Sequence, residues 1–192
     1  TDAYEQLRRN TPEFEELAAM QAGFEYRPIV ARRAGTQDSA QSLMGEFVSG
    51  NYFRTFGLRP AAGRLFSDSD NFKGALIVAV MSYEKWKNDY AGNPSIVGST
   101  FFVNTKPVTI VGIAPEKFYG DRLSPTPPDY YLPIESMPAI ANVPYVHDPE
   151  ARWLYIVGRV RPGYSLPQLK AKVSVLLQQA LAPLRTYSSE KG

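Results

Sequence analysis

The residues of this chain that could perform chemistry are few and scattered. His147 is the only histidine, and the chain contains no cysteine. A Ser-His-Asp triad or a histidine metal centre would have to be assembled around this one side chain, which lies in the proline-bounded segment Tyr145–Pro149. No Gly-x-Ser-x-Gly nucleophile elbow accompanies it. We interpret His147 as a surface residue and predict no catalytic residue and no metal site.

The carboxylates offer two kinds of chemistry. Pairs of them hydrolyse glycosides when a fold holds them at the required separation. Asp68 and Asp70, followed by Asn71, also resemble the start of a calcium loop, but the central glycine and terminal glutamate of an EF-hand are missing. Helix starts and turns explain these residues more simply, and the same holds for the other acidic residues considered: Glu13, Glu15, Glu16, Asp121, Asp129 and Asp148.

Several other functions are disfavoured by composition. The glycines form neither a Gly-x-Gly-x-x-Gly nor a Gly-Lys-Ser/Thr phosphate-binding motif, so we predict no bound cofactor. The 21 basic residues only slightly exceed the 19 acidic ones, and a net charge of +2 argues against nucleic acid as a partner. No window approaches the roughly 18 consecutive apolar residues of a membrane span.

Adjacent aromatic residues are the remaining conspicuous class. Neighbours on a strand point to opposite faces, so one of a pair can enter the core while the other meets a partner. The segment from Pro115 to Pro149 is rich in proline and aromatics, and aromatic exposure often marks an interface. We therefore single out four candidate partner contacts, with core packing as the alternative: Phe118, Tyr119, Tyr130 and Tyr131.

The elements that must position these residues follow from periodicity and capping. Thr11, Pro12 and Glu13 are typical of a helix start and predict a helix over Pro12–Ala22. A hairpin of Phe24–Arg32 and Gln41–Val48 follows. Further along, the patterns predict strands at Leu76–Met81, Gly98–Val103, Val108–Ile113, Tyr130–Ile134 and Leu154–Val160, and helices at Tyr83–Tyr90 and Leu166–Leu184.

An ordered series of short motifs runs from Val48 to Pro115. It consists of VSGNYF at 48–53, GRLF at 63–66, VAVMSY at 78–83, Trp86, GNPSIVG at 92–98, VN at 103–104 and VGIAP at 111–115. In order and spacing this series resembles the periplasmic core domain of MacB-type ABC transporter permeases. The closing segment RWLYIVGRVRPGYSL at 152–166 is similar to that family as well.

The resemblance implies an α+β fold with a discontinuous arrangement. A porter-like α/β subdomain would be built from both chain ends, residues 1–72 and 151–192, and interrupted by a β-rich, Sabre-like subdomain over residues 73–150. The strand Leu154–Val160 would join the hairpin strands in one sheet. Thr1 and the end of the closing helix would emerge on the same, membrane-facing side.

The resemblance also implies a function in transport rather than catalysis. As in MacB-like permeases, the chain would be the extracytoplasmic domain on the periplasmic side of the bacterial inner membrane, anchored by flanking transmembrane helices. An ABC ATPase domain or subunit would hydrolyse ATP in the cytoplasm, and this domain would couple that motion to cargo export or release. A second permease copy and a periplasmic adaptor are the further partners implied. Two alternatives stay open: a module that binds a peptide, lipoprotein or hydrophobic small molecule, and a periplasmic hydrolase.

Overall fold

The computed structural model describes residues 2–189 with gaps at 24–25, 123 and 149–150. Its helices are α1 (Asp2–Asn10), α2 (Tyr52–Thr55), α3 (Tyr83–Tyr90), α4 (Met137–Ala141) and α5 (Leu166–Ser189). Its strands are β1 (Phe14–Gln21), β2 (Arg27–Arg33), β3 (Gln41–Val48), β4 (Ala62–Gly63), β5 (Val78–Met81), β6 (Thr100–Val103), β7 (Lys106–Ile113), β8 (Tyr130–Pro133) and β9 (Leu154–Val160). Short 3-10 turns lie at Asp68–Asp70, Pro94–Ile96, Ile134–Ser136 and Pro144–His147. This mixture of helices and strands confirms the α+β class.

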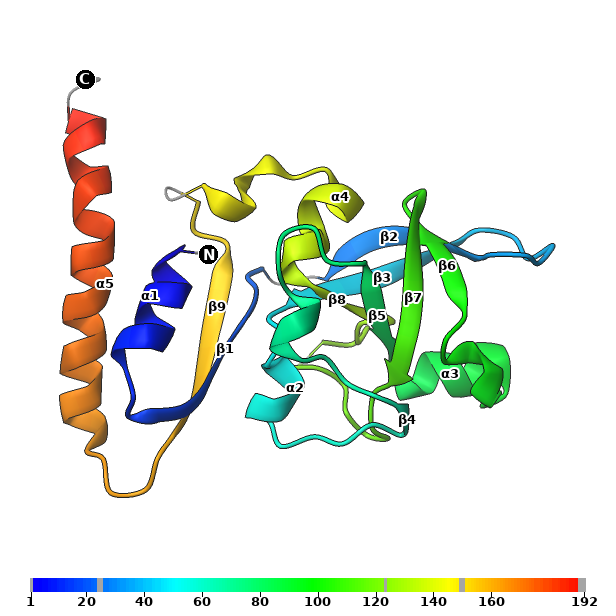
Figure 1. Ribbon diagram of the computed structural model, residues 1–192, viewed down its shortest axis with the longest axis horizontal. Coiled ribbons are helices and arrows are strands. Elements are labelled where there is room, and N and C mark those ends of the chain that lie inside the picture. The colour runs from blue at the N-terminus through cyan, green and yellow to red at the C-terminus, as the bar shows by residue number, and fades with distance from the viewer. Residues whose placement is uncertain (1, 24–25, 123, 149–150, 190–192) are drawn as a thin grey trace.

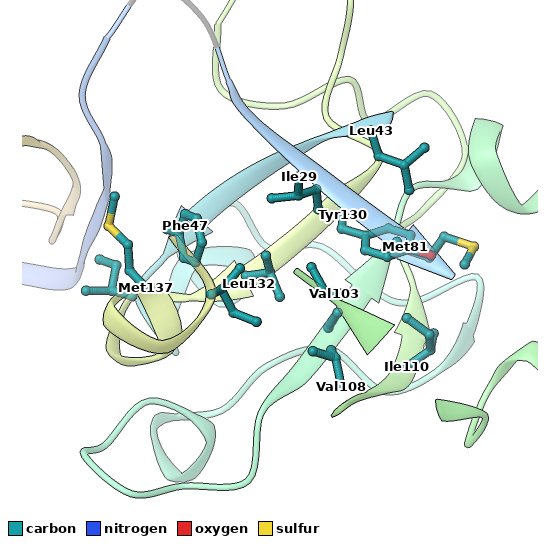
Figure 2. Close-up of a cluster of buried hydrophobic side chains, with 14 of the residues drawn as sticks. Ile29, Leu43, Phe47, Met81, Val103, Val108, Ile110, Tyr130, Leu132 and Met137 are labelled. Atoms are coloured by element: carbon teal, nitrogen blue, oxygen red, sulfur yellow. The ribbon is translucent and has the colours of Figure 1, made fainter. Parts of the chain in front are cut away.

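Six of the strands close into a ring. Their order is β2-β6-β7-β5-β8-β3, and β3 pairs back onto β2. The β3–β8 and β5–β7 pairs are parallel, and the other pairs in the ring are antiparallel. Inward-facing side chains fill the interior, as is usual in a small closed barrel, and Figure 2 shows Ile29, Phe47, Ile110 and Leu132 converging there.

The two chain ends form a separate layer beside the ring (Figure 1). β1 and β9 are antiparallel along their whole length, from Phe14↔Val160 to Gln21↔Leu154. α1 and α5 pack together on one face of this strand pair, and α2 lies against the other face. We call α1, β1, β9 and α5 the terminal unit. One register pair, Met20↔Val48, joins its strands to the ring.

The start of α1 and the end of α5 point to the same side of the molecule, at the top of Figure 1. The two helices run antiparallel, so the chain enters and leaves the terminal unit on the same side. This agrees with the expected placement of the chain ends, although Thr1 itself lies outside the described residues.

The helix predicted over Pro12–Ala22 is wrong. Most of this segment is the strand β1, and Thr11 ends the preceding helix α1, where its hydroxyl donates to the Leu7 carbonyl at 2.6 Å. Every residue from Leu17 to Gln21 is buried, because β1 is covered by α1 and α5 on one face and by α2 on the other. A strand buried on both faces shows no alternation of polar and apolar residues, so its pattern cannot be told from that of a short helix.

The other predicted elements are close to the observed ones. β3 and α3 have the predicted bounds, and Ser82 caps α3 by accepting a hydrogen bond from the Lys85 amide. The predicted hairpin is confirmed, since β2 pairs with β3, and β9 lies in the same sheet as both strands, as expected, although its direct partner is β1. β2 and β3 also pair with β6 and β8, which come from the segment expected to be an insertion. The sheet is therefore continuous across residue 73, and a division into subdomains at 72/73 and 150/151 stays a prediction.

Candidate functional site at the junction of the terminal unit and the ring

Of the four aromatic candidates, Tyr119 is exposed, Phe118 is partly buried, and the other two are fully buried. Tyr130 and Tyr131 are both fully buried, so the expectation that they contact a partner is corrected. β8 lies between β5 and β3 in the ring. It directs Tyr130 into the interior and Tyr131 onto the outer face beneath α2. Phe118 stacks on Tyr131 with ring centroids 5.8 Å apart and is partly buried. Tyr119 is 51% exposed.

The other residues considered for chemistry also lie apart. The His147 imidazole pairs with Glu135 at 3.1 Å on an exposed turn. Asp70 forms a capping box with Ser67 and a two-point ion pair with Arg64, in which both N···O distances are 2.7 Å. Within the described ranges, no group of three or more His, Cys, Asp or Glu side chains could hold a metal ion.

The structure instead concentrates polar side chains where the terminal unit meets the ring. Asn51, between β3 and α2, is completely buried and lies at the centre of this network. Its amide nitrogen donates to the Leu17 carbonyl and to the Glu16 carboxylate, both at 2.9 Å. Its amide oxygen accepts from the hydroxyls of Ser49 at 2.8 Å and Tyr4 at 3.2 Å.

Ser49 and Tyr4 extend this network along β1. The Ser49 hydroxyl accepts a hydrogen bond from the Ala19 amide at 3.0 Å, and the Ser49 amide donates to the Ala19 carbonyl at 2.8 Å. Tyr4 on α1 also donates to the Leu17 carbonyl at 2.8 Å. Burial raises the pKa of Tyr4 to about 12, so its hydroxyl keeps its proton at physiological pH. Asn51 thus binds both α1, through Tyr4, and β1, through Glu16 and Leu17.

A chain of ion pairs surrounds this buried network. Arg54 of α2 bonds both Glu16 of β1 and Asp68, the latter at 3.1 Å, and Arg8 of α1 donates to both Asp68 oxygens at 3.0 Å. Burial raises the carboxylate pKa values of Glu16 and Asp68, but the hydrogen bonds from arginine outweigh it and the net pKa of each is lowered. On the other strand, Arg159 of β9 donates to the Thr55 carbonyl at the end of α2.

A second contact lies at the far end of β1. Arg122, in the segment between β7 and β8, donates to the carbonyls of Gln21 at 2.9 Å and Gly23 at 2.6 Å. The same guanidinium bonds Glu46 of β3 at 2.7 Å. Arg122 therefore ties the end of the terminal strand to the outer face of the ring.

Sequence reasoning identified only part of this junction. Ser49 and Asn51 belong to the VSGNYF motif at 48–53, although the motif itself does not state their role. Glu46 carries a detectable signal, because it is a charged residue in the strand Gln41–Val48 whose neighbours at 44 and 48 share its face. Arg122 carries none, since its partners are about a hundred positions away in sequence.

The junction provides hydrogen bonds between two structural layers, and no metal-binding cluster lies among the described residues. These hydrogen bonds hold the terminal unit and the ring together and indicate a structural rather than a catalytic junction. Two glycines of the motif series allow close backbone approach beside the ring. Gly63 and Gly112 face each other across β4 and β7, and a Cβ on Gly112 would lie 2.0 Å from the Arg64 carbonyl oxygen.

Comparison with known proteins identifies the family. Residues 1–176 match the family described as the MacB-like periplasmic core domain, and the chain belongs to that family. No curated protein matches the chain. No helix among the described residues is both long and apolar enough to cross a membrane.

Solved structures share the fold. The periplasmic region of MacB from Actinobacillus actinomycetemcomitans has a TM-score of 0.65 at 13% identity, over 93% of this chain and 72% of that one. The extracellular domain of the noncanonic ABC-type transporter YknZ from Gram-positive bacteria has a TM-score of 0.60 at 14% identity, over 91% and 81%. A domain of a putative permease protein from Porphyromonas gingivalis has a TM-score of 0.61 at 14% identity, over 92% and 69%.

Membership of this family indicates where domains of this kind occur. Its homologues are periplasmic or extracellular parts of ABC transporter permeases, which implies a membrane setting and an ATPase partner in general terms. The periplasmic domain of MacB-like permeases is not itself catalytic.

Proposed function

We propose that this domain couples ATP-driven motion in the cytoplasm to the export or release of cargo on the periplasmic side of the bacterial inner membrane. Flanking transmembrane helices would anchor the chain, and an ABC ATPase domain or subunit would hydrolyse ATP. Movement of the membrane helices would enter through α1 and α5, pass to β1 and β9, and reach the ring through the junction around Asn51.

One observation supports this proposal above the others. The chain enters and leaves the terminal unit on one side. The strands of the unit join the ring through a single register pair, Met20↔Val48, supplemented by the backbone bond from the Ser49 amide to the Ala19 carbonyl and by side-chain bonds. A narrow backbone connection allows two packed layers to change their relative orientation as units. α5, with 24 residues, is also long enough to carry displacement over about 36 Å.

Electron spin resonance distances in the whole permease test this proposal. One spin label is placed at Val175 on α5 and another at Asn88 on α3, since both positions are exposed and this chain contains no native cysteine. We expect the distance distribution to differ between the nucleotide-free state and the ATP- and vanadate-trapped state. A control pair at Asn88 and Lys106, both on the body that contains the ring, should keep one distribution throughout. Identical distributions for the Val175–Asn88 pair in the two states would contradict coupling through the terminal unit.

Partner contacts are a further part of this proposal. We assign Tyr119, with Phe118 beside it, to a surface that meets a second permease copy or a periplasmic adaptor, because Tyr119 is half exposed on the segment that also carries Arg122. In the whole permease, a photo-crosslinking residue at position 119 should give a discrete cross-linked product. The same residue at exposed Asn88 on α3 is the control.

A cargo-binding module is the second candidate, and one observation favours it. A hollow of about 580 Å³ lies on the outer surface of β2 and β6, where Val30 is 49% and Phe102 37% exposed. Its lining places Val30, Ala40 and Phe102 beside Arg32, Asn104 and Thr105, which suits a ligand that carries both an apolar chain and polar groups, such as a lipopeptide. NMR titration with a short acyl-peptide should then shift the Val30 and Phe102 resonances saturably, whereas uniform small shifts across the surface would count against a cargo site.

A further inference from the structure

We propose that Glu46 and Asp121 form a buried proton-binding site, in which the two carboxyl groups share one proton and thereby hold Arg122 on the end of β1. This site goes beyond the coupling function and does not depend on it.

The first argument is charge. The Glu46 side chain is fully buried, the Asp121 side chain is 8% exposed, and the Arg122 side chain is 15% exposed. Arg122 bonds Glu46 at 2.7 Å and Asp121 at 3.1 Å. Two ionised carboxylates facing one guanidinium would leave a net negative charge inside the protein, which is costly in a medium of low polarity. One proton on the pair removes this excess.

The second argument is an unpaired atom. One oxygen of Glu46, Oε2, is buried without a hydrogen-bond partner, while the other accepts from Arg122. An ionised oxygen in that position would be left desolvated, whereas a protonated one needs only a nearby acceptor, which the facing Asp121 carboxylate supplies. Burial, followed by the charge of Asp121, raises the pKa of Glu46 well above its usual range, and Arg122 only partly opposes this.

The neighbouring groups do not supply a compensating charge. Within the described residues, Glu46 is faced by Asp121 and Arg122 and by the phenols of Tyr26, Tyr52 of α2 and Tyr131 of β8. The Arg122 guanidinium lies over the Tyr26 ring, 4.7 Å from its centroid. Burial raises the pKa of each phenol, so all three stay neutral. The phenol oxygens are themselves buried without partners, so the environment of Glu46 is uncharged apart from the Asp121–Arg122 pair.

The site is tightly covered but reachable by protons. A Cβ on Gly120 would lie 2.5 Å from the Tyr26 hydroxyl, and the Gly120 backbone has a φ of 102°, which favours glycine. This brings the 120–122 segment close to the Tyr26 ring. On the other side, Asp121 and Arg122 line a hollow of about 430 Å³ with Met20 and Tyr155, through which water can exchange protons with the pair.

The consequence is a proton-dependent latch. Because the pKa of Glu46 is raised on folding, the stabilisation from its protonated form is fully present below the unfolded-state pKa, near 4.3, and is lost as pH rises through the folded-state value. Loss of the proton sets two negative charges against each other beside Arg122. The 120–122 segment should then release the Gln21 and Gly23 carbonyls, so alkaline conditions loosen this contact between the ring and the terminal unit.

Carboxyl carbon NMR of this chain tests the proton site directly, with assignments made through the side chain so that no variant is needed. We expect the Glu46 carboxyl carbon to keep its protonated chemical shift at pH values where a solvated glutamate has already lost its proton. Asp121→Asn should lower the titration midpoint of Glu46, since a single carboxylate then faces Arg122. An ordinary midpoint for Glu46 in the unmodified chain would overturn the proposal.

Hydrogen exchange tests the latch. The Ala22 amide, which donates to the Trp153 carbonyl, reports on the end of β1. After correction for intrinsic exchange, its protection should fall by up to about tenfold for each pH unit between the pKa of a solvated glutamate and the Glu46 midpoint, and should level off above that midpoint. Glu46→Gln, which mimics the protonated state, should remove this dependence. Equal pH dependence in the two proteins, or none in the unmodified chain, would refute the latch.

Discussion

The two contacts between the terminal unit and the ring use the same kinds of groups in different surroundings. At the Asn51 junction, Glu16 faces Arg54, whose side chain is 48% exposed, and hydrogen bonds lower the pKa of Glu16. At the Arg122 contact, Glu46 is fully buried beside a second carboxyl group, and its pKa is raised. The comparison shows that the balance of charges and the access of water, rather than the presence of an arginine, decide whether a carboxyl group holds its proton.

The two contacts should therefore respond oppositely to pH. Acid protonates Glu16 and Asp68 and removes their ion pairs, whereas acid favours the protonated form of Glu46. As pH falls through the lowered pKa values of Glu16 and Asp68, the ion pairs around Asn51 weaken while the Arg122 contact is retained. The predictions below test this contrast, from the largest expected effect to the smallest.

Replacement of the buried arginine should have the largest effect. Arg122→Met leaves Glu46 and Asp121 without their counter-charge and should destabilise the chain by about 3–5 kcal/mol at neutral pH. The loss should shrink as pH falls, because Glu46 is then neutral and less negative charge is left without a counter-charge. Urea unfolding over a pH series measures this. Exposed Arg59→Met is the matched control and should stay within about 0.5 kcal/mol, and a pH-independent loss in Arg122→Met would argue against buried carboxylates as its cause.

Truncation of the central amide should come next. Asn51→Ala removes one partner each of the Tyr4 hydroxyl, the Ser49 hydroxyl and the Glu16 carboxylate, so several groups of the network lose a bond. We expect a loss of about 2–4 kcal/mol with little dependence on salt, measured by thermal unfolding. Asn88→Ala on the exposed face of α3 provides the control. A loss as small as that of the control would mean that the junction is held by strand packing alone.

Glu16→Gln and Glu46→Gln should change the pH dependence of stability in opposite directions. Glu16→Gln should cost about 1 kcal/mol at neutral pH, because it removes a charged partner of Arg54 and Asn51. The pKa of Glu16 is lowered on folding, so the stability that its ionised form provides is present above the unfolded-state pKa and is lost as pH falls through the folded-state value. The two proteins should converge in acid.

Glu46→Gln should instead differ from the unmodified chain most at high pH, where it should be the more stable of the two. Unfolding free energies for both variants, measured across the same pH series, give the comparison. Curves that diverge in the same direction for Glu16→Gln and Glu46→Gln would show that the two contacts do not differ in the way we infer.

The smallest effect should come from the exposed ion pair that links α1 to the 3-10 turn. A double-mutant cycle with Arg8→Ala and Asp68→Ala should give a coupling energy of about 0.2–1 kcal/mol, since both side chains are substantially exposed. Raising the salt concentration to about 1 M should reduce it further, because the Debye length falls to about 3 Å. A coupling that persists in high salt would indicate that this pair is more desolvated than its exposure suggests.

Local signals in the sequence determined several parts of this protein. α3 lies between a serine cap and the left-handed residue Ala91 before Gly92, and its bounds were predictable because both signals act within a few residues. The strand-like run Gln41–Val48 likewise predicted β3, and the motif series from Val48 to Pro115 indicated the family that residues 1–176 match.

Tertiary structure alone decided the rest, because the deciding contacts are remote in sequence. β1 is a strand since Val157 and the other residues of β9 pair with it, and burial on both faces hides its periodicity. The ring closes only when β2 meets both β3 and β6, which merges segments that the sequence suggested were separate. Tyr131 is buried because α2 and Phe118 cover it, and Glu46 meets Arg122 across 76 positions of chain. No local pattern encodes such contacts, since their free energy depends on solvent exclusion by groups that only the folded chain brings together.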